Sequence, residues 1–375
     1  MYSRMTQSYD SLVESETVTT CVWGTVYNNM NFSGNKTNTN ADTVPTLQQA
    51  VYTGSSIGHI KVWYLQEESS DLELKYVCKQ KSPILRLLIN NANTWLVSKT
   101  LEGCIRIFDA STMEVKFQFK IKNTIRNVNI QFSIDEMFLL TESSDTCLSF
   151  YDITSAEITS TYEIGGYFTS YILSHKGDVI IVGYADGTVK TFDCVSAENN
   201  VTIRNPNIGS VTCLVTCYKS FYLIIGFSSG LIKLYSQTHG ELLKVYEKPH
   251  KTAVVSIAVN PNNKTFVTLS RDFIMKVWNL TETLPEVKLK EHRDLPIHIK
   301  YSNPELISEL DFEGLDNIKR YLVSKEEEGH YNFLPPPSLQ QTPGQVLFSR
   351  DGKKLISVAH QFIAIHSCPR SQARL

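Results

Sequence analysis

One short pattern recurs along the chain at nearly constant spacing. Each copy is a tight turn followed by an apolar run that ends in an aromatic residue, as in GCIRIFDA and GTVKTFDC. The runs begin at residues 59, 104, 147, 188, 231 and 273, so successive copies lie 41 to 45 residues apart. A period of this length with several short strands per unit predicts an all-β repeat array rather than one compact core.

The sixth unit has the clearest internal order. An apolar run at 253–259 precedes a turn and a second run at 264–270, and a tight turn leads to FIMKVWN at 273–279. A weaker run, PEVKLK at 285–290, completes the unit. Four short runs separated by turns predict a four-stranded antiparallel sheet. Near-continuous apolar composition in the first two runs predicts burial on both faces.

These repeats resemble those of the WD-repeat β-propeller family, over nearly all of the chain. The resemblance implies a single propeller of four-stranded blades. The matching features are the aromatic-acid strand ends, the tryptophans at the family's Trp position, one Asp-Gly turn and a His before the first strand: Phe108-Asp109, Tyr151-Asp152, Phe192-Asp193, Trp63, Trp278, Asp186-Gly187, His250 and His292.

The resemblance also implies a buried hydrogen-bond chain in each blade, from the His through a Ser or Thr and the turn Asp to the Trp. Only the sixth unit has all of these, in His250, Thr268 or Ser270, Asp272 and Trp278. In most other units Phe or Tyr replaces Trp and offers no indole N–H. We therefore expect this chain of bonds in the sixth unit alone.

The number of blades depends on the segment after the sixth unit. The next clear third strand begins at residue 361, twice the usual spacing away, and 296–323 can be divided into strands, which gives eight blades. Leu306, Leu310, Ile318 and Leu322 also fit the apolar stripe of a helix inserted at 303–328. We favour seven blades plus this insertion, with eight as the alternative.

The domain organisation follows from this count. Residues 17–367 form the propeller, with loop insertions at 28–45 and about 303–344 and a tail at 368–375. The last unit contains only three strands, so we expect the N-terminal segment 1–16 to supply its fourth strand and close the blade. Pro335 to Pro337 lie in the 326–344 segment, which we interpret as a loop, with a docking motif as the alternative.

Composition excludes some classes of function. A formal net charge of -2 and a pI near 6.5 give no basic field, so no direct nucleic-acid binding is expected. The N-terminal stretch has no apolar centre and no window suits a membrane span, which predicts a cytoplasmic or nuclear protein. The eight cysteines are scattered and are interpreted as reduced thiols.

No motif for chemistry is present. Cys213 and Cys217 would lie about 13 Å apart on one strand face, too far to share a zinc ion. The first-strand starts, which line the channel in enzymatic propellers, carry no repeated acid. We therefore expect no catalytic residue, no metal site, no cofactor and no enzymatic activity.

Partner binding is the remaining hypothesis, because loops on a rigid scaffold commonly carry recognition. The loops between second and third strands and those entering the first strands supply aromatic and cationic candidates. The predicted contact residues are Tyr184, Phe227, Arg271, Arg126, Lys251 and Arg293. Their cations suit an acidic or phosphorylated peptide. Tyr167, Phe168 and Phe273 are expected to be core residues instead.

The predicted function is a non-catalytic scaffold or adaptor subunit of a complex with other proteins. The alternatives are a substrate receptor of a ubiquitin ligase and a hydrolytic propeller. The pathway and the partner do not follow from the sequence, because propellers serve many unrelated functions.

Overall fold

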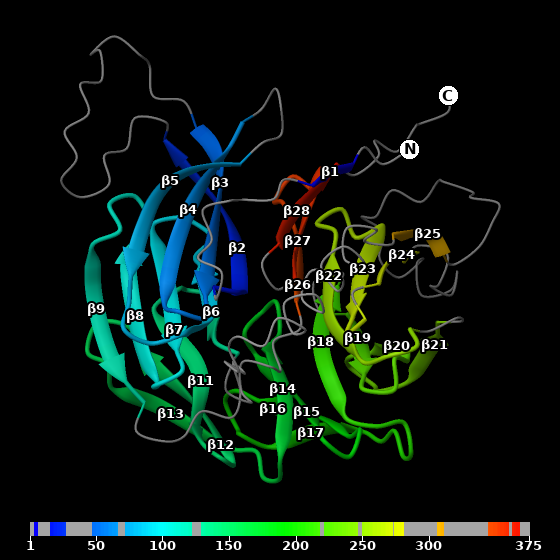
Figure 1. The fold of residues 1–375 in the computed structure, drawn as a ribbon. Helices are drawn as coiled ribbons and strands as arrows, with labels where there is room; N and C mark the ends of the chain where they lie inside the picture. The colour runs from blue at the N-terminus through cyan, green and yellow to red at the C-terminus, as the bar shows by residue number, and fades with distance from the viewer. Residues whose placement is uncertain are drawn as a thin grey trace, which may run out of the picture. The chain divides into compact units, whose positions relative to one another are not determined.

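The computed structural model describes 4–6, 16–27, 47–66, 72–121, 129–217, 221–246, 250–272, 274–280, 306–310, 344–359 and 362–367. Every regular element in these ranges is a β-strand, which confirms the all-β fold class. The described strands form seven four-stranded antiparallel sheets. Figure 1 labels the strands along the chain.

The sheets follow the order of the repeats. The first contains β2 (Val18–Tyr27), β3 (Leu47–Ser55), β4 (His59–Leu65) and β5 (Leu72–Lys79). The second contains β6 (Ile84–Ile89), β7 (Trp95–Thr100), β8 (Cys104–Asp109) and β9 (Val115–Lys120). The third contains β10 (Gln131–Phe132), β11 (Phe138–Ser144), β12 (Cys147–Asp152) and β13 (Ile158–Glu163).

The next three sheets repeat this arrangement. The fourth contains β14 (Phe168–Leu173), β15 (Val179–Tyr184), β16 (Val189–Asp193) and β17 (Asn199–Ile203). The fifth contains β18 (Val211–Cys217), β19 (Tyr222–Phe227), β20 (Ile232–Ser236) and β21 (Leu242–Val245). The sixth contains β22 (Val254–Val259), β23 (Thr265–Ser270), β24 (Met275–Asn279) and β25 (Leu306–Leu310).

The seventh sheet combines both ends of the described chain. Its strands are β26 (Gln345–Phe348), β27 (Lys354–Ala359), β28 (Phe362–Ser367) and β1 (Arg4–Thr6). β1 lies antiparallel beside β28, with Arg4 opposite His366 and Thr6 opposite Ala364. The strand order is therefore β1-β28-β27-β26, whereas the other six sheets follow chain order.

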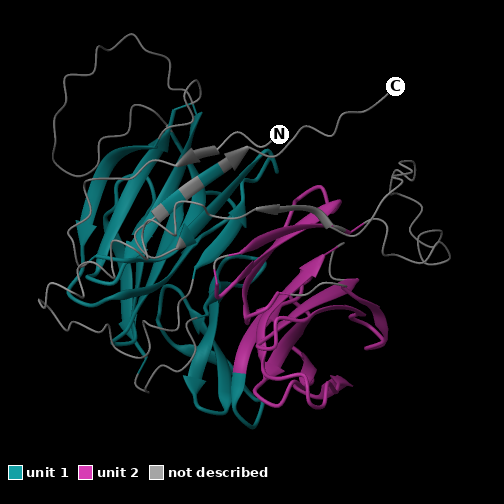
Figure 2. Ribbon diagram, turned by 45° about the vertical axis from the view of Figure 1, so that its right-hand side comes forward, with its two compact units in different colours: residues 1–168, 335–375 teal, residues 169–334 magenta. Residues whose placement is uncertain are grey.

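The described chain divides into two compact units, coloured in Figure 2. Residues 1–168 and 335–375 form the first unit, and residues 169–334 form the second. Each unit has its own buried apolar clusters between its sheets.

Burial differs between the strands of one sheet, as the apolar runs predict. All six residues of β19 are buried, and so are the last five of β7 and of β15. The fourth strand β9 alternates exposed and half-buried residues instead. The second strands are therefore covered on both faces, and the fourth strands face solvent along one side.

Glycine allows neighbouring sheets to approach closely at one repeated position of the second strand. A Cβ on Gly54 would lie 2.9 Å from Ile84 Cβ, and one on Gly183 would lie 2.8 Å from Val211 Cβ. Gly226 packs against Val254 in the same way. The Ile or Val comes in each case from the first strand of the next sheet.

The second and third sheets carry buried charges at this position. Lys99 lies opposite Ile105, and Glu142 lies opposite Leu148, between the second and third strands of their sheets. Gly54 lies opposite Ile60 at the same place in the first sheet. Lys99 is fully buried and donates hydrogen bonds to Thr141 Oγ1 at 3.0 Å and to the Asn129 carbonyl at 3.2 Å. A polar contact thus joins the second and third sheets where glycine packing joins others.

The turn glycines explain why the opening pattern recurs. Gly58, Gly103, Gly187 and Gly230 all have φ between +79° and +88°, a region that glycine enters without steric cost. A Cβ on Gly187 would also lie 2.7 Å from the carbonyl oxygen of Asn205. Both the backbone conformation and the close approach therefore require glycine there.

The sixth sheet corrects one expectation. Its outer strand is β25, which pairs with β24 through Met275 opposite Leu310 and Trp278 opposite Leu306. The predicted outer strand at 285–290 lies outside the described residues. A helix through 306–310 is therefore wrong, and so is the eight-blade assignment of this strand to a separate sheet. The open edge of β24 offers unpaired N–H and C=O groups, which the backbone of 306–310 satisfies.

Several expected segments lie outside the described residues. They are the insertion at 28–45, the Pro-containing segment up to residue 343, and the tail at 368–375.

Candidate functional site

The expected hydrogen-bond chain of the sixth sheet is present in part: it links His250, Thr268 and Trp278, but it does not include the turn aspartate Asp272. Trp278 Nε1 donates to Thr268 Oγ1 at 2.8 Å, and His250 Nε2 lies 2.7 Å from the same oxygen. Trp278 and Thr268 are fully buried, and His250 is nearly so. Asp272 accepts a hydrogen bond from the Ser270 hydroxyl instead.

Burial sets the protonation state of His250. Desolvation and, to a smaller extent, the nearby Lys276 lower its pKa to about 4, against the opposing attraction of Asp272. The imidazole is therefore neutral at neutral pH. A neutral buried histidine that bonds to a core threonine has a structural role.

His250 precedes the first strand of its sheet, and in other sheets a different polar residue lies at this position. Sequence reasoning missed these residues. Gln80 Nε2 donates to Ser98 Oγ at 2.8 Å, and Gln80 Oε1 accepts from Arg106. Asn205 Oδ1 accepts from Tyr235 Oη at 2.6 Å and from Lys233 Nζ at 3.0 Å. The number of residues between the polar residue and the first strand varies, so no fixed motif marks the position.

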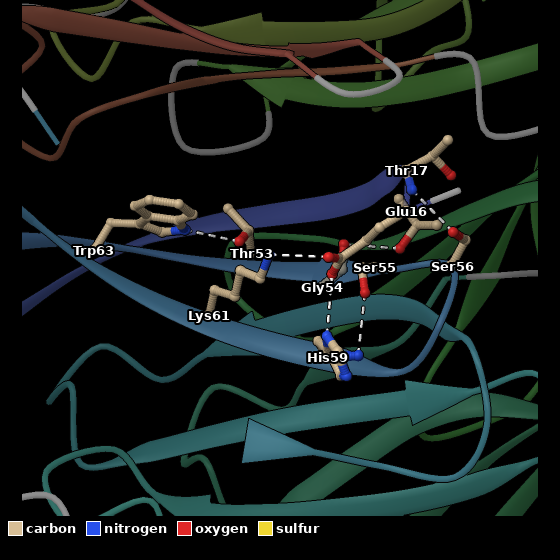
Figure 3. Close-up of polar contacts among 10 residues, drawn as sticks. Glu16, Thr17, Thr53, Gly54, Ser55, Ser56, His59, Lys61 and Trp63 are labelled. Atoms are coloured by element: carbon tan, nitrogen blue, oxygen red, sulfur yellow. Dashed lines mark hydrogen bonds and ion pairs between the residues drawn. The ribbon is translucent and has the colours of Figure 1, made fainter. Parts of the chain in front are cut away.

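The first sheet uses a carboxylate in this role, as Figure 3 shows. Glu16 is fully buried, with Oε2 2.9 Å from Lys61 Nζ and Oε1 3.4 Å from His59 Nδ1. Trp63 Nε1 donates to Thr53 Oγ1 at 2.9 Å, and Thr53 pairs with Lys61 across the strands. The Trp–Thr bond therefore also occurs in the first sheet, without the histidine that bonds to the threonine in the sixth sheet.

The aspartates at the ends of the third strands cap the following turns. Asp152 Oδ1 accepts hydrogen bonds from the backbone N–H of Thr154 and of Ser155, both at 2.8 Å. Asp193 does the same for Val195 and Ser196. These bonds, led by that from the Thr154 hydroxyl, lower the pKa of Asp152 to about 2. The aromatic-acid pattern thus has a structural cause.

Two predicted contact residues lie in the core. Phe227 is fully buried as the last residue of β19 and packs with Val211 and Ile225. Tyr184 ends β15 and is 6% exposed, with Lys190 Nζ 5.1 Å from its ring centroid. Placing them in the turns was wrong, because the second strands extend to these residues.

Two predicted cations do lie at the surface, close together. Lys251 and Arg271 are exposed. The Arg271 N–H donates to the Ala253 carbonyl at 2.8 Å, and the Asp272 N–H donates to Thr252 Oγ1 at 3.1 Å. Within the described ranges, neither charged group has a hydrogen-bond or ion-pair partner. We call Lys251 and Arg271 the cation pair.

The other predicted residues divide into two groups. Arg126, Arg293 and Phe273 lie outside the described residues. Tyr167 was expected in the core, but its side chain is 71% exposed. It follows Gly165 and Gly166, both with positive φ, in the loop that enters β14. Phe168 is half-buried.

The described residues contain little that could perform chemistry. No group of three or more His, Cys, Asp or Glu within them is placed to hold a metal ion. Burial lowers the pKa of Lys99 to about 8, against the attraction of Glu142. Lys99 is nevertheless fully buried between sheets, so a substrate has no access to it. No described helix is long and apolar enough to cross a membrane.

Comparison with known proteins identifies the class to which these sheets belong. The family model "WD domain, G-beta repeat" matches residues 240–279, which include the His250–Thr268–Trp278 chain. Sheets of four antiparallel strands at this spacing are typical of the blades of a β-propeller. The chain is a WD-repeat protein, as its sequence resemblance predicts.

Named relatives agree with this assignment. A chicken (Gallus gallus) protein, "U3 small nucleolar RNA-associated protein 15 homolog", is 29% identical over 64% of this chain and 44% of its own length. A zebrafish (Danio rerio) protein, "p21-activated protein kinase-interacting protein 1-like", is 30% identical over 29% of each chain. "WD repeat-containing protein 55" of Arabidopsis thaliana is 24% identical over 52% of this chain and 56% of its own length. This chain therefore spans less than two thirds of each of these relatives.

Proposed function

We propose that this protein is a non-catalytic scaffold or adaptor subunit that binds other proteins of a complex. Its buried polar groups serve the fold, which leaves surface loops to provide function. Two relatives carry names that describe association, one with a small nucleolar RNA and one with a protein kinase. Association with other macromolecules is the property that these names share.

The cation pair is the observation that carries the proposed binding site. Lys251 and Arg271 lie on adjacent loops, are exposed, and have no internal charge partner within the described ranges. Two unneutralised cations on backbone held by hydrogen bonds suit an acidic or phosphorylated peptide. Tyr184 and Phe227 are not part of this site, because they are buried.

We further propose seven blades, with the N-terminal segment 1–16 closing the last of them. The number of four-stranded sheets and the pairing of β1 with β28 support this arrangement. A nuclear location is proposed from the small nucleolar RNA in the chicken relative's name. Direct binding of nucleic acid is not expected, given the net charge of -2.

The test is quantitative affinity purification from native lysate. Wild type is compared with a Lys251→Ala/Arg271→Ala variant whose thermal unfolding is unchanged. A Lys176→Ala/Lys353→Ala variant is the matched control, because it removes two exposed cations from turns at the other end of their sheets. Loss of a stoichiometric partner from the first variant alone supports the proposal. A wild type that retains no partner refutes the adaptor function.

A further inference from the structure

Most large exposed apolar residues lie at the same end of their own sheets. In a four-stranded antiparallel sheet, the turn between strands 1 and 2 and the turn between strands 3 and 4 lie at one end (the 1–2/3–4 end). The turn between strands 2 and 3 lies at the other end. Eight of the ten large exposed hydrophobic residues in the described ranges lie at the 1–2/3–4 end. They are Leu47, Val115, Ile134, Met137, Ile158, Val195, Phe221 and Leu242. Tyr167 and Val245 lie at the other end.

Four of these residues lie on two neighbouring sheets of the first unit. Val115 begins β9, Ile158 begins β13, and Ile134 and Met137 lie in the turn between β10 and β11. Their side chains are between 46% and 53% exposed. We call these four residues the turn patch. Half-exposed aliphatic side chains leave much of their apolar surface in contact with water, so they are candidates for an interface.

Hydrogen bonds hold these turns next to one another. Glu136 Oε2 accepts from Asn90 Nδ2 at 2.9 Å, and Glu136 Oε1 accepts from the Asn91 N–H at 2.5 Å. These bonds join the turns of the second and third sheets. Within the third sheet, the Ile153 N–H donates to the Met137 carbonyl at 3.1 Å. Within the second sheet, the Ala110 N–H donates to the Thr94 carbonyl at 2.8 Å, which ties the turn before Val115 to the turn that contains Asn90. The backbone that carries the turn patch is therefore held in place on both sheets.

The charges in the turns that carry the turn patch are mainly negative. One cation from another sheet, Arg350, donates hydrogen bonds to the carbonyl oxygens of Asn90 and Asn91. The turns at 109–116, 133–138 and 152–158 contain six acids and one base. That base, Lys116, lies 3.4 Å from Glu114 and is thereby partly neutralised. Glu114, Asp135 and Glu157 are exposed. The surface is thus apolar with an acidic border.

We propose that the turn patch binds a protein segment with apolar side chains flanked by lysine or arginine. Aliphatic anchors fill the apolar centre, and the cations face Glu114, Asp135 and Glu157. Phosphates of nucleic acid or anionic lipid are repelled by the same acids. A second copy in symmetric contact would oppose acid to acid. This proposal does not depend on the cation pair, which belongs to a sheet of the second unit and to the other end of that sheet.

The test uses a fluorescent synthetic amphipathic peptide, with leucine on one face and arginine on the other, and the full-length protein. We expect saturable binding that weakens roughly tenfold in an Ile134→Ser/Ile158→Ser variant, because two anchors are lost. An Asp135→Asn/Glu157→Gln variant should weaken binding and reduce its dependence on salt. Val245→Ser is the matched control at the other end and should bind as wild type does.

Further controls keep the proposal open to refutation. A peptide with glutamate in place of arginine should bind at least roughly tenfold more weakly. A photo-crosslinker on the arginine peptide should label residues 133–138 and 152–158. Equal binding by both peptides, equal binding by the Ile134→Ser/Ile158→Ser variant, or no binding to wild type overturns the proposal. A dimer in sedimentation that the same variant abolishes would also overturn it, in favour of a second copy.

The Lys251→Ala/Arg271→Ala variant separates this proposal from the proposed function. It should bind the arginine peptide as wild type does. If it loses its cellular partner but keeps the peptide, the two surfaces are independent.

Discussion

Trp278 and Thr268 are joined by a 2.8 Å hydrogen bond from the indole nitrogen to the hydroxyl oxygen, and both side chains are fully buried. Thr268 therefore lies between the indole and the imidazole of His250 and serves both. Trp63 and Thr53 repeat the bond at 2.9 Å in the first sheet, where Glu16 takes the place of the histidine but pairs with Lys61. The two sheets therefore share the bond from tryptophan to threonine and differ in the third polar group.

Removal of the Thr268 hydroxyl should destabilise the protein. Thr268→Val keeps the shape of the side chain but leaves the Trp278 N–H and His250 without their partner. A buried donor without an acceptor costs about 1–3 kcal/mol. Thr268→Ser keeps the hydroxyl and should cost less. Denaturant unfolding of both variants measures the difference, and equal losses would show that the bond contributes nothing.

Acid should destabilise the protein through His250. Its folded-state pKa is about 4, below the ordinary 6.5, because burial disfavours the charged imidazole. The unfolded chain binds the proton first, so stability is fully present above pH 6.5 and falls as the pH drops towards 4. The loss is at most about 3 kcal/mol, since one pKa unit equals about 1.4 kcal/mol.

A His250→Gln variant checks this pH dependence. Its unfolding free energy should fall less than that of wild type between pH 6.5 and 4. His175→Gln, at an exposed position, is the control and should keep the wild-type slope. Identical slopes in all three proteins would contradict the assignment to His250.

Substitution of Gly187 should destabilise more than substitution of Gly165. Both have positive φ, at +83° and +64°, so alanine is strained at either position by about 1 kcal/mol. Only at Gly187 does a new Cβ also meet a carbonyl oxygen, that of Asn205 at 2.7 Å, while Gly165 has open space. Thermal unfolding of Gly187→Ala and Gly165→Ala gives the comparison. A larger loss at Gly165 would contradict the close approach.

The Glu16–Lys61 pair should show strong coupling. Lys61→Met leaves a fully buried carboxylate without its 2.9 Å partner, which costs about 3–5 kcal/mol. The double variant Glu16→Gln/Lys61→Met removes both charges and should be more stable than Lys61→Met alone. A double-mutant cycle in denaturant measures the coupling. Additive losses would mean that the two charges act independently.

The repeats could be predicted from sequence because their signals are local. The third strands β8 and β16 lie between a turn glycine, Gly103 or Gly187, and a capping acid, Asp109 or Asp193, and both act within a few residues. The roles of Gln80, Asn205 and Glu16 could not be predicted in this way. Each acts through a partner on a strand further along the chain, and its spacing from its own first strand varies.

The candidate sites were harder to predict than the fold. Phe227 and Tyr184 lie beside turns in sequence, yet the second strand continues to these residues and buries them. Tyr167 lies just before a strand and was expected to be buried there, but it is exposed in the loop that contains Gly165 and Gly166. Side-chain exposure at a strand end depends on the neighbouring sheet, which a single repeat does not encode. The exposure of Lys251 and Arg271 was predictable, because both residues lie in loops between strands.

The pairing of β1 with β28 also has a consequence for synthesis of the protein. Arg4 is opposite His366, so the two partners leave the ribosome about 360 residues apart. At about 5–20 residues per second, the first strand waits roughly 20–70 s for its partner. The seventh sheet therefore cannot be completed until β28 has been translated. Ribosome-bound chains in which β28 has not yet emerged should lack this sheet, and its edge should be open to chaperones during that interval.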